Sequence, residues 1–457
     1  MIPFPASVAD QDTRFRLLLV AENISLTQSG ETSIPYYYLE GFLRRQIGVQ
    51  AICHARVREE LRRDLPAEVF NRVTFIEDSP VQKMVFALGK VFHYRIEDLV
   101  FGQIIHVITQ VRMRGIAKQL IRAHRIDLVF QPVPISPKAL SFMFGFKVPV
   151  VIGPMCGGLE LPPAFASLDG GLVTWSIERS RALANLMHRV IPGKRDAAAL
   201  IVGNKRTEKA LPNGMRGAVY EVVESGVDLG RWAPKLYPID GRGKKVRFVF
   251  CGRLVDWKGA QYLVKAFAPL ARRGGVALDL IGDGELYEDI ERQVAAEGIA
   301  DSVVLHGRVP LERCIALMTA GDVYVMPSLR ECGGLALLEA MALGLPIVAT
   351  NWMGPAEYLN DSCAILVAPD SERAMVSGFS AAMIKLADAP ALRRSLGEAA
   401  RKRVSDGYYS WQNKVDRIVE ILVDVLKQAP GRQSTRGFLN KGYEEPGRTE
   451  CQRRRST

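Results

Sequence analysis

Short apolar runs alternate with amphipathic stretches along most of the chain. In the N-terminal half, the apolar runs have the length and composition of buried parallel strands, and helical patterns separate several of them. These runs are RFRLLLVAEN (14–23), VQAICHA (49–55), IDLVFQP (126–132), VPVVIGP (148–154) and AALIVGN (198–204). Strands that alternate with helices predict βαβ units and a doubly wound parallel sheet.

The alternation stops once and then begins again. The segment WAPKLYPIDGRGKK (232–245) is rich in Pro, Gly and Lys and has no periodicity, so it is predicted to be a linker. Strand and helix patterns resume from VRFVFCG (246–252) to PIVATN (346–351), and the amphipathic run KVDRIVEILVDVLK (414–427) predicts a final helix. We therefore expect an N-terminal Rossmann-like domain, a linker, a second α/β domain, a helix that packs back on the first domain, and a disordered basic tail. Their predicted boundaries are 1–235, 236–245, 246–413, 414–428 and 429–457.

Composition and charge narrow the classes of partner. The chain has 457 residues, of which 48% are hydrophobic, and this composition excludes a mainly disordered or fibrous protein. Its net charge of +11 favours anionic partners such as nucleotide phosphates or anionic lipids. Nucleic acid is the weakest of these interpretations, because no basic stripe interleaved with aromatic residues is found.

Cysteine spacing and hydropathy indicate the cellular compartment in which the protein functions. The seven cysteines are scattered without ligand spacing, which argues against a disulfide scaffold and a zinc site and favours free thiols. The N-terminal residues are unlike a secretory signal, and no uninterrupted apolar run reaches the ~18 residues that indicate a membrane-spanning helix. We expect a cytoplasmic protein that is soluble or, at most, lies on the inner face of the membrane.

The first candidate constellation is a cationic turn after a predicted strand. Gly252 ends the strand, Arg253 and Lys258 follow, and a helix is expected to begin near Gly259. Free amides at a helix N-terminus favour an anion, and two cations across the same turn could hold a diphosphate from two sides. The alternative is that both are surface charges on an ordinary turn.

The second constellation is a carboxylate pair around two glycines. Glu331 lies in a loop after a strand, Gly333 and Gly334 allow a close approach of the backbone to a ligand, and Leu335 is expected to begin a helix. Glu339 is placed in about the first turn of that helix, where a carboxylate could accept hydrogen bonds from vicinal hydroxyls. Stabilisation of the helix dipole is the alternative role for Glu339.

Taken together, these segments resemble the family-4 retaining glycosyltransferases of the GT-B fold, which are also called glycosyltransferase group 1. The resemblance rests on G-R-L-x3-K-G (252–259), I-G-D-G (281–284), V-L-H-G-R-V (304–309) and E-x7-E from Glu331 to Glu339. It is strong over residues 200–428, and it implies two doubly wound Rossmann-like domains that face a cleft.

The resemblance also implies a role for each candidate residue. Arg253 and Lys258 would bind the donor diphosphate and stabilise the leaving group, Glu331 would contact the donor sugar, and Glu339 would hold the ribose. The nucleobase would lie near Arg308 and Val309, and Gly30 would let the first N-terminal loop reach the phosphates. The leaving phosphate would help to deprotonate the acceptor, so no metal, cofactor or protein base is required. The complete donor-binding prediction consists of Gly30, Gly252, Arg253, Lys258, Gly282, Arg308, Val309, Glu331, Gly333, Gly334, Leu335 and Glu339, with Arg253, Lys258 and Glu331 as catalytic residues.

Two departures from the family pattern affect the acceptor and sugar sites. Family members usually have an aromatic residue where Gly333 stands, and many have a histidine on an N-terminal loop. The corresponding loops here (131–137 and 153–163) contain no histidine, and His106, in an apolar helical stretch, is interpreted as packed. No acceptor-side catalytic residue can therefore be assigned.

The resulting hypothesis is a hexosyltransferase that uses a nucleotide diphospho-sugar and retains the anomeric configuration. Its acceptor is expected to be a bacterial surface glycan or a lipid-linked sugar, because the chain is basic and two apolar, basic stretches (84–120 and 175–195) could lie on an anionic membrane. Packing of these stretches on the N-terminal sheet is the alternative. Rival functions are an epimerase or phosphorylase of the same fold, and a catalytically silent nucleotide-sugar-binding or scaffold protein.

Overall fold

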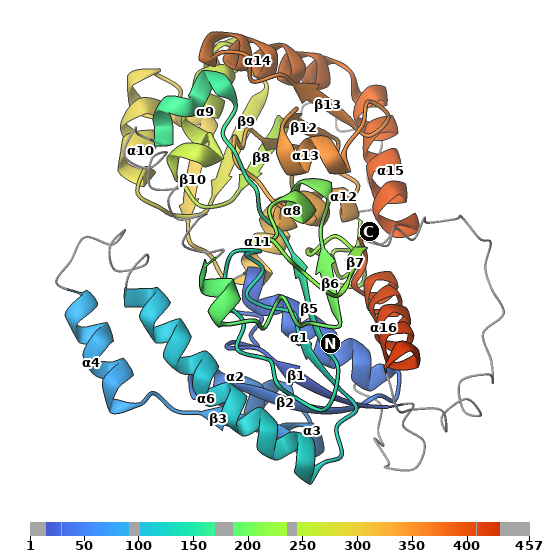
Figure 1. Ribbon diagram of the computed structural model, residues 1–457. Helices are drawn as coiled ribbons and strands as arrows, with labels where there is room; N and C mark the ends of the chain where they lie inside the picture. The colour runs from blue at the N-terminus through green and yellow to red at the C-terminus, as the bar shows by residue number, and fades with distance from the viewer. Residues whose placement is uncertain are drawn as a thin grey trace. The chain divides into compact units, whose positions relative to one another are not determined.

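Two compact units make up the chain in its computed structural model (Figure 1), which describes residues 15–28, 30–90, 101–169, 186–234, 245–407 and 409–429. The N-terminal unit comprises Met1–Gly157, Ala182–Glu224 and Val415–Thr457, and the C-terminal unit comprises Gly158–Arg181 and Ser225–Lys414. Most of the predicted linker (236–245) and of the predicted tail (429–457) lies outside the described residues, as does part of the basic stretch 175–195.

The N-terminal unit is built on a seven-stranded parallel sheet in the order β3-β2-β1-β4-β5-β6-β7. Strand β1 is paired on both sides, with Leu17 opposite Val49 on one neighbour and Leu128 on the other. The strands are β1 (Arg16–Val20), β2 (Gly48–His54), β3 (Val73–Ile76), β4 (Leu128–Gln131), β5 (Val150–Met155), β6 (Ala199–Val202) and β7 (Ala218–Glu221). The helices of this unit before the last one are α1 (Gly30–Arg44), α2 (Arg58–Asp64), α3 (Ala67–Phe70), α4 (Pro80–Gly89), α6 (Gly102–Ala123) and α8 (Lys205–Lys209).

The C-terminal unit contains a six-stranded parallel sheet in the order β10-β9-β8-β11-β12-β13. Its strands are β8 (Val246–Cys251), β9 (Val276–Ile281), β10 (Val303–Gly307), β11 (Val323–Met326), β12 (Ile347–Thr350) and β13 (Ala364–Val367). Its helices are α9 (Ala260–Arg273), α10 (Tyr287–Ala296), α11 (Leu311–Thr319), α12 (Leu335–Ala342), α13 (Met353–Tyr358), α14 (Glu372–Asp388) and α15 (Pro390–Asp406). Sheets covered by helices on both faces have almost continuously apolar strands, and β9, β11 and β12 are buried along their whole length.

The strand order reverses at the centre of each sheet. In the C-terminal unit the chain runs outward from β8 to β10 and then crosses to β11 on the other side of β8. This is the doubly wound order, and ligands of such sheets bind outside the carboxyl ends of the strands at the point of reversal. The predicted fold class is thus confirmed for both units, and the β8–β11 edge is the place to look for a site.

A segment from the middle of the sequence completes the core of the C-terminal unit. The 3-10 helix η3 (Pro163–Asp169) places Phe165 against Tyr262 of α9, with 5.5 Å between the ring centroids. Trp352 Nε1 donates a hydrogen bond to the carbonyl oxygen of Glu160 at 2.9 Å. Residues 158–169 therefore belong to the second core although they precede β6 of the first sheet.

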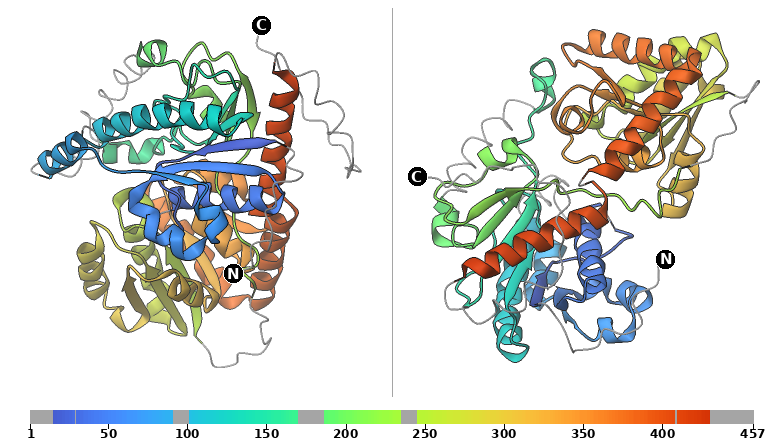
Figure 2. Two further views of the ribbon diagram at one scale, coloured as in Figure 1. Left: turned by 90° about the horizontal axis from the view of Figure 1, so that it is seen from below. Right: turned by 90° about the vertical axis from the view of Figure 1, so that its right-hand side faces the viewer.

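The final helix, α16 (Trp411–Gln428), lies beside α1 (Figure 2). A Cβ atom at Gly41 would come within 2.6 Å of Val415 Cγ2, so only glycine allows this approach of the two helices. Arg45 Nε also forms an ion pair with Asp416 Oδ1 at 2.6 Å. From Val415 onward, α16 is thus part of the N-terminal unit. Within the described residues, no helix is both long enough and apolar enough to cross a bilayer.

Candidate functional site

The two sequence constellations lie at the carboxyl ends of the two strands that flank the strand-order reversal. Arg253 and Lys258 follow β8, and Glu331 and Glu339 follow β11. Strands β8 and β11 are adjacent in the sheet, with Val323 opposite Phe248. The loops that carry the candidate cations and carboxylates are therefore neighbours, although about 75 residues separate them in the sequence.

Glycine brings the two loops into direct contact. Gly259 has a left-handed backbone (φ 76°) between η4 (Asp256–Lys258) and α9, and a Cβ atom there would lie 2.3 Å from the carbonyl oxygen of Pro327. Beside it, the amide of Leu329 donates a hydrogen bond to the carbonyl oxygen of Trp257 at 2.8 Å. These two contacts fix the position of Lys258 relative to the loop that carries Glu331.

Lys258 and Glu331 form a direct ion pair. Their side chains are 23% and 12% exposed, so the pair is largely shielded from water. Arg253, by contrast, is 66% exposed and pairs with Glu285 at 3.0 Å. The geometry therefore joins two of the three predicted catalytic residues and places the third at the solvent-exposed side of the same turn.

The start of α12 supplies backbone donors beside this pair. Gly334 is the N-cap residue in a left-handed conformation (φ 55°), and Leu335 is the first helical residue, as predicted. The first amides of a helix have no acceptor within the helix and carry its positive dipole end, so they favour an anionic group. Gly333 and Gly334 are buried, and neither has a side chain that would obstruct the approach to these amides.

Another glycine holds the backbone of Glu331 in place. The amide of Gly354, in the first turn of α13, donates a hydrogen bond to the carbonyl oxygen of Glu331 at 3.2 Å. A Cβ atom at Gly354 would lie 1.8 Å from the carbonyl oxygen of Cys332. Helix α13 can pack this closely on the Glu331 loop only because residue 354 has no side chain.

Substitution of Gly354 by alanine is expected to lower the free energy of unfolding by about 1–3 kcal/mol, because the loop must shift to relieve the overlap. The same shift would move Glu331 away from Lys258. Gly115→Ala is the matched control: it lies inside α6 with open space around its Cβ position, and it should stabilise by about 0.5–1 kcal/mol. Urea unfolding of both variants measures this, and a Gly354→Ala protein as stable as the wild type would contradict the packing argument.

Glu339 is the fifth residue of α12 and thus lies in its second turn, slightly further along the helix than expected. Burial raises its pKa to about 8; the nearby Cys314 adds to the rise, and Arg231 opposes it. A carboxyl group with such a pKa is mostly protonated at neutral pH. It can therefore both donate and accept a hydrogen bond, which suits the hydroxyls of a ribose.

Two free thiols that the sequence patterns did not bring together lie beside Glu339. Cys251, the last residue of β8, and Cys314 of α11 have their Sγ atoms 3.6 Å apart. The shared hydrogen bond raises the pKa of Cys251 and lowers that of Cys314. The expectation of free thiols holds for Cys53, Cys251, Cys314 and Cys363 but is wrong for Cys156 and Cys332, which are disulfide-bonded.

The remaining predicted residues are distributed around the same sheet edge, with one exception. Gly282, after β9, has φ 136°, and a Cβ atom there would be 2.0 Å from the carbonyl oxygen of Gly252, so the β8 and β9 loops also touch. Arg308 and Val309 follow β10; Arg308 is exposed and Val309 is half-buried. Gly30 is the first residue of α1 in the N-terminal unit and is not among the residues grouped here.

The N-terminal unit has a cavity at the carboxyl edge of its own sheet. This cavity, of about 210 Å³, is lined by Glu22, Asn23, Glu31, Thr32, His106, Val133 and Pro134. His106 Nδ1 and Glu22 Oε1 are 2.5 Å apart. The sequence interpretation of His106 as a packed residue did not include this contact with the residues that follow β1.

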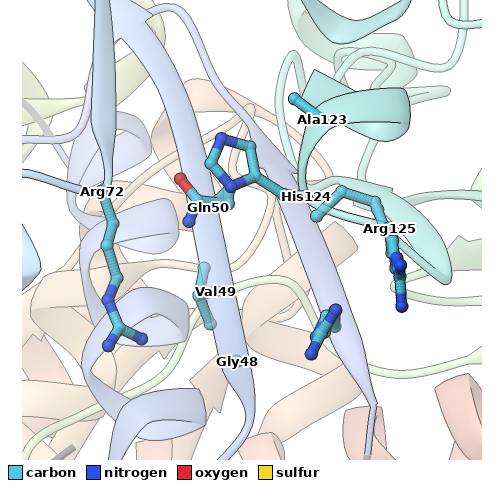
Figure 3. Close-up of a pocket in the computed structure, with 9 residues that line it drawn as sticks. Gly48, Val49, Gln50, Arg72, Ala123, His124 and Arg125 are labelled. Atoms are coloured by element: carbon cyan, nitrogen blue, oxygen red, sulfur yellow. The ribbon is translucent and has the colours of Figure 1, made fainter. Parts of the chain in front are cut away.

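A second cavity, of about 340 Å³, lies at the opposite, amino edge of the same sheet (Figure 3). Its arginine side chains are Arg16 of β1, Arg72 directly before β3 and Arg125 after α6, and His124 is the C-cap residue of α6. A cation near the end of a helix interacts favourably with its last carbonyl groups, and this accounts for Arg125 without a ligand. The carboxyl edges of the sheets therefore remain the candidate sites.

A model of a known protein family matches most of the C-terminal unit. Residues 239–403 match the model of the glycosyl transferases group 1, a span that contains every predicted donor-site residue except Gly30.

Curated relatives agree with this match. A GDP-mannose-dependent alpha-(1-6)-phosphatidylinositol monomannoside mannosyltransferase of Mycolicibacterium smegmatis is 28% identical over 320 residues, which are 67% of this chain and 78% of that protein. The corresponding monoacylated-substrate enzyme of Corynebacterium glutamicum is 31% identical over 44% of this chain and 56% of its own length. A D-inositol 3-phosphate glycosyltransferase of Pseudarthrobacter chlorophenolicus is 33% identical over 49% of this chain and 54% of its own length. For the last two, the match spans little more than half of the relative.

Solved structures share the fold over nearly the whole chain. A glycosyltransferase from Rickettsia africae has a TM-score of 0.60 at 14% identity and covers 91% of this chain and 99% of its own. Anabaena HepE, solved with UDP and glucose, has a TM-score of 0.59 at 17% identity and covers 90% of this chain and 99% of its own. These likenesses show that the fold is GT-B. The family match and the curated relatives show that the C-terminal unit, over residues 239–403, belongs to the group 1 glycosyltransferases.

Proposed function

We propose that this glycosyltransferase moves a hexose from a nucleotide diphospho-sugar to an acceptor hydroxyl with retention of configuration, without a metal or another cofactor. The observation that carries the proposal is the Lys258–Glu331 pair beside the N-terminus of α12, at the strand-order reversal. A cation, free amides and a carboxylate meet there, and these are the groups that a charged diphosphate and a hydroxylated sugar require.

Each donor contact follows from the chemistry of the groups. Lys258, Arg253 and the first amides of α12 hold the diphosphate, and the two cations stabilise the negative charge that develops on the leaving phosphate. Glu331 contacts the hydroxyls of the sugar, Glu339 holds the ribose, and Arg308 and Val309 lie near the base. Gly30, the first residue of α1, is also a proposed donor-binding residue. With two cations for the leaving group, the leaving phosphate itself can accept the proton of the acceptor.

The acceptor is proposed to be a glycan or lipid-linked sugar in bacterial surface polysaccharide or glycolipid synthesis. Helix α4 exposes large apolar side chains (Val81, Met84, Phe86 and Leu88, each at least 50% exposed), and α6 exposes Ile104 and Val111. Such side chains among lysines suit the surface of an anionic membrane. Two of the relatives are named for phosphatidylinositol monomannoside substrates, which are lipids. We propose a cytoplasmic enzyme that contacts the inner face of the membrane at this surface.

A donor panel tests the proposal. Thermal shifts are measured with UDP-, GDP-, ADP- and dTDP-sugars, and a sugar present at 100 times its dissociation constant should stabilise the fold by about 2.7 kcal/mol. One nucleotide class should give a shift that Arg253→Ala and Lys258→Ala lose. Product analysis by NMR should then show the donor's anomeric configuration, and turnover should persist in EDTA. An inverted product or loss of turnover in EDTA would overturn the mechanism.

A second candidate is a nucleotide-sugar-binding or scaffold protein without activity. It is favoured by Gly333, which stands where family members usually have an aromatic residue. Both candidates predict a donor shift, but only the enzyme transfers the sugar, so release of free nucleoside diphosphate in the presence of acceptor separates them.

A further inference from the structure

Two free thiols face each other at the carboxyl edge of the C-terminal sheet. Cys251 is the last residue of β8, Cys314 is the fourth residue of α11, and their Sγ atoms are 3.6 Å apart. Both residues are half-buried, so the pair is not enclosed in the core. A disulfide has about 2.0 Å between its sulfur atoms, so the two thiols need to approach by roughly 1.6 Å to form one.

The two thiols differ in the way that disulfide formation requires. The hydrogen bond from Cys251 lowers the pKa of Cys314, and the same hydrogen bond, together with burial, raises the pKa of Cys251. Cys314 also lies at the end of the first turn of α11, where the positive end of the helix dipole favours a thiolate. Cys314 is therefore the nucleophile, and Cys251 keeps its proton.

The thiol pair is in electrostatic contact with the donor-site side chains. Besides its hydrogen bond to Cys314 and its burial, the pKa of Cys251 is affected by the charges of Glu339, which raises it, and Lys258, which lowers it. Burial raises the pKa of Glu339, and the charge of Cys314 adds to this rise. A covalent change of the pair therefore acts on Glu339 and Lys258.

The backbone of Cys251 is held in place by both neighbouring strands. Its carbonyl oxygen accepts a hydrogen bond from Tyr324 Oη of β11 at 3.3 Å, and Tyr324 is fully buried. The next amide, that of Gly252, donates to the carbonyl oxygen of Ile281 of β9 at 3.0 Å. Because β8 is fixed in this way, the approach of the two sulfur atoms must come from the side chains and from α11.

Helix α11 is joined directly to the residues proposed to lie near the nucleobase. Arg308 and Val309 follow β10, and Pro310 is the N-cap residue of α11. The amide of Cys314 donates to the carbonyl oxygen of Pro310 at 2.9 Å. Close-packed protein interiors transmit strain, so a displacement of Cys314 toward β8 also displaces Pro310 and the residues before it.

We propose that Cys251 and Cys314 form a redox-sensitive modification site, at which a hydroperoxide converts the two thiols into a disulfide and thereby weakens donor binding. The effect on the donor rests on the proposed function, whereas formation of the disulfide does not.

The oxidation proceeds in two balanced steps. The thiolate of Cys314 attacks one oxygen of hydrogen peroxide, the O–O bond breaks, and hydroxide leaves and takes a proton from solvent to become water. Cys314 is then a sulfenic acid. The sulfur of Cys251 attacks the sulfur of Cys314, the S–S bond forms, the S–O bond breaks, and the departing hydroxide leaves as water with the proton of Cys251. Two thiols are oxidised, and one peroxide is reduced to two molecules of water.

Peptide mapping tests disulfide formation on the full chain without any donor. The protein is reduced with dithiothreitol, desalted and oxidised with hydrogen peroxide, and its remaining thiols are alkylated before digestion with trypsin. Cleavage after Arg and Lys places Cys251 in peptide 248–253 and Cys314 in peptide 314–330. The wild-type protein should give these two peptides joined by a bond that dithiothreitol breaks. Their absence as a joined pair would overturn the proposal.

Serine variants show whether the bond is specific. Cys314→Ser and Cys251→Ser should each abolish the joined peptides. The matched control is Cys363→Ser, because Cys363 is a buried free thiol whose Sγ donates to the carbonyl oxygen of Asn360 at 3.4 Å. Cys363 lies in a different peptide, 331–373, and its variant should form the Cys251–Cys314 bond like the wild type.

Donor affinity is then compared before and after oxidation, with the nucleotide sugar identified by the thermal-shift panel. The oxidised wild-type protein should bind this donor about five-fold or more weakly than the reduced protein, the lower end of the usual coupling between two sites. Dithiothreitol should restore the affinity. In Cys314→Ser the oxidant should leave the affinity unchanged, and this variant keeps Cys156 and Cys332, so it reports any effect of oxidation at those residues.

The two measurements separate this proposal from the proposed function. If the disulfide forms but no donor binds, then the proposed function fails and the modification site stands. If a donor binds equally well before and after the disulfide forms, then the effect on the donor is overturned and the transferase stands. An equal loss of affinity in the wild type and in Cys314→Ser would place the sensitive thiols elsewhere and would also overturn that effect.

Discussion

Lys258→Ala is expected to lower kcat/KM for the donor by about 10²–10³-fold, the loss typical when one preorganised charge or donor is removed from a developing anion. The lysine side chain is 23% exposed and directly contacts Glu331, so it is held in place before the donor arrives. Alanine removes the charge that is proposed to face the leaving phosphate, and it leaves Glu331 without its partner. Steady-state transfer assays with the donor identified by the thermal-shift panel measure the effect.

A lysine nearby on the same segment provides the matched control. Lys265 of α9 pairs with Glu372 at 2.5 Å, and its side chain is 45% exposed. An exposed pair contributes little, so Lys265→Ala should stay within about two-fold of the wild-type kcat/KM. Equal activity of the Lys258→Ala and Lys265→Ala variants would remove Lys258 from the proposed site.

The second large effect is on stability, through Glu339. Its pKa in the folded protein is about 8, against an ordinary value of 4.5. Between these values the folded protein keeps a proton that the unfolded chain has released, so the free energy of unfolding falls as the pH rises through this window. The expected loss of unfolding free energy is on the order of 3 kcal/mol. One pKa unit corresponds to about 1.4 kcal/mol, and the partial exposure of Glu339 reduces the full value. Melting temperatures should therefore fall by roughly 6–12 °C.

Glu339→Gln removes this titration and should flatten the pH dependence between pH 5 and 8.5, with the larger gain in stability at the alkaline end. Glu420→Gln, which removes an exposed carboxylate from α16, controls for the general loss of one negative charge. Melting curves across this range compare the three proteins. A slope that is the same in Glu339→Gln and in the wild type would show that Glu339 does not hold the proton.

The donor-side geometry could be predicted from the sequence because its signals are local. Arg253 and Lys258 directly follow an apolar strand, and the glycines before Leu335 mark the start of a helix, so both constellations are expected at a carboxyl sheet edge. The adjacency of β8 and β11 follows from the doubly wound order. The direct pairing of Lys258 with Glu331 does not follow, because it depends on the contact between Gly259 and Pro327, which are distant in the sequence.

The N-terminal cavity was missed because its residues are separated in the sequence. Glu22, His106 and Gln131 lie on three elements, and their hydrogen bonds depend on long-range packing. One local signal was present: His106 and Gln110 are four residues apart in an apolar stretch and thus lie on one face of a helix. The transfer of residues 158–169 to the second core had no such signal, since Leu161 and Phe165 resemble any other apolar core residues.

The pairing of Lys258 with Glu331 has a consequence for how anionic ligands bind to the site and leave it. Because Glu331 already neutralises the charge of Lys258, the pair offers little net attraction to inorganic anions. Under the proposed roles, a complete donor replaces the contact between the two residues. Lys258 then binds the diphosphate, and Glu331 binds the sugar. A spent nucleoside diphosphate satisfies only the lysine and leaves the carboxylate alone. Under the same proposed roles, re-formation of the ion pair favours the departure of the nucleoside diphosphate.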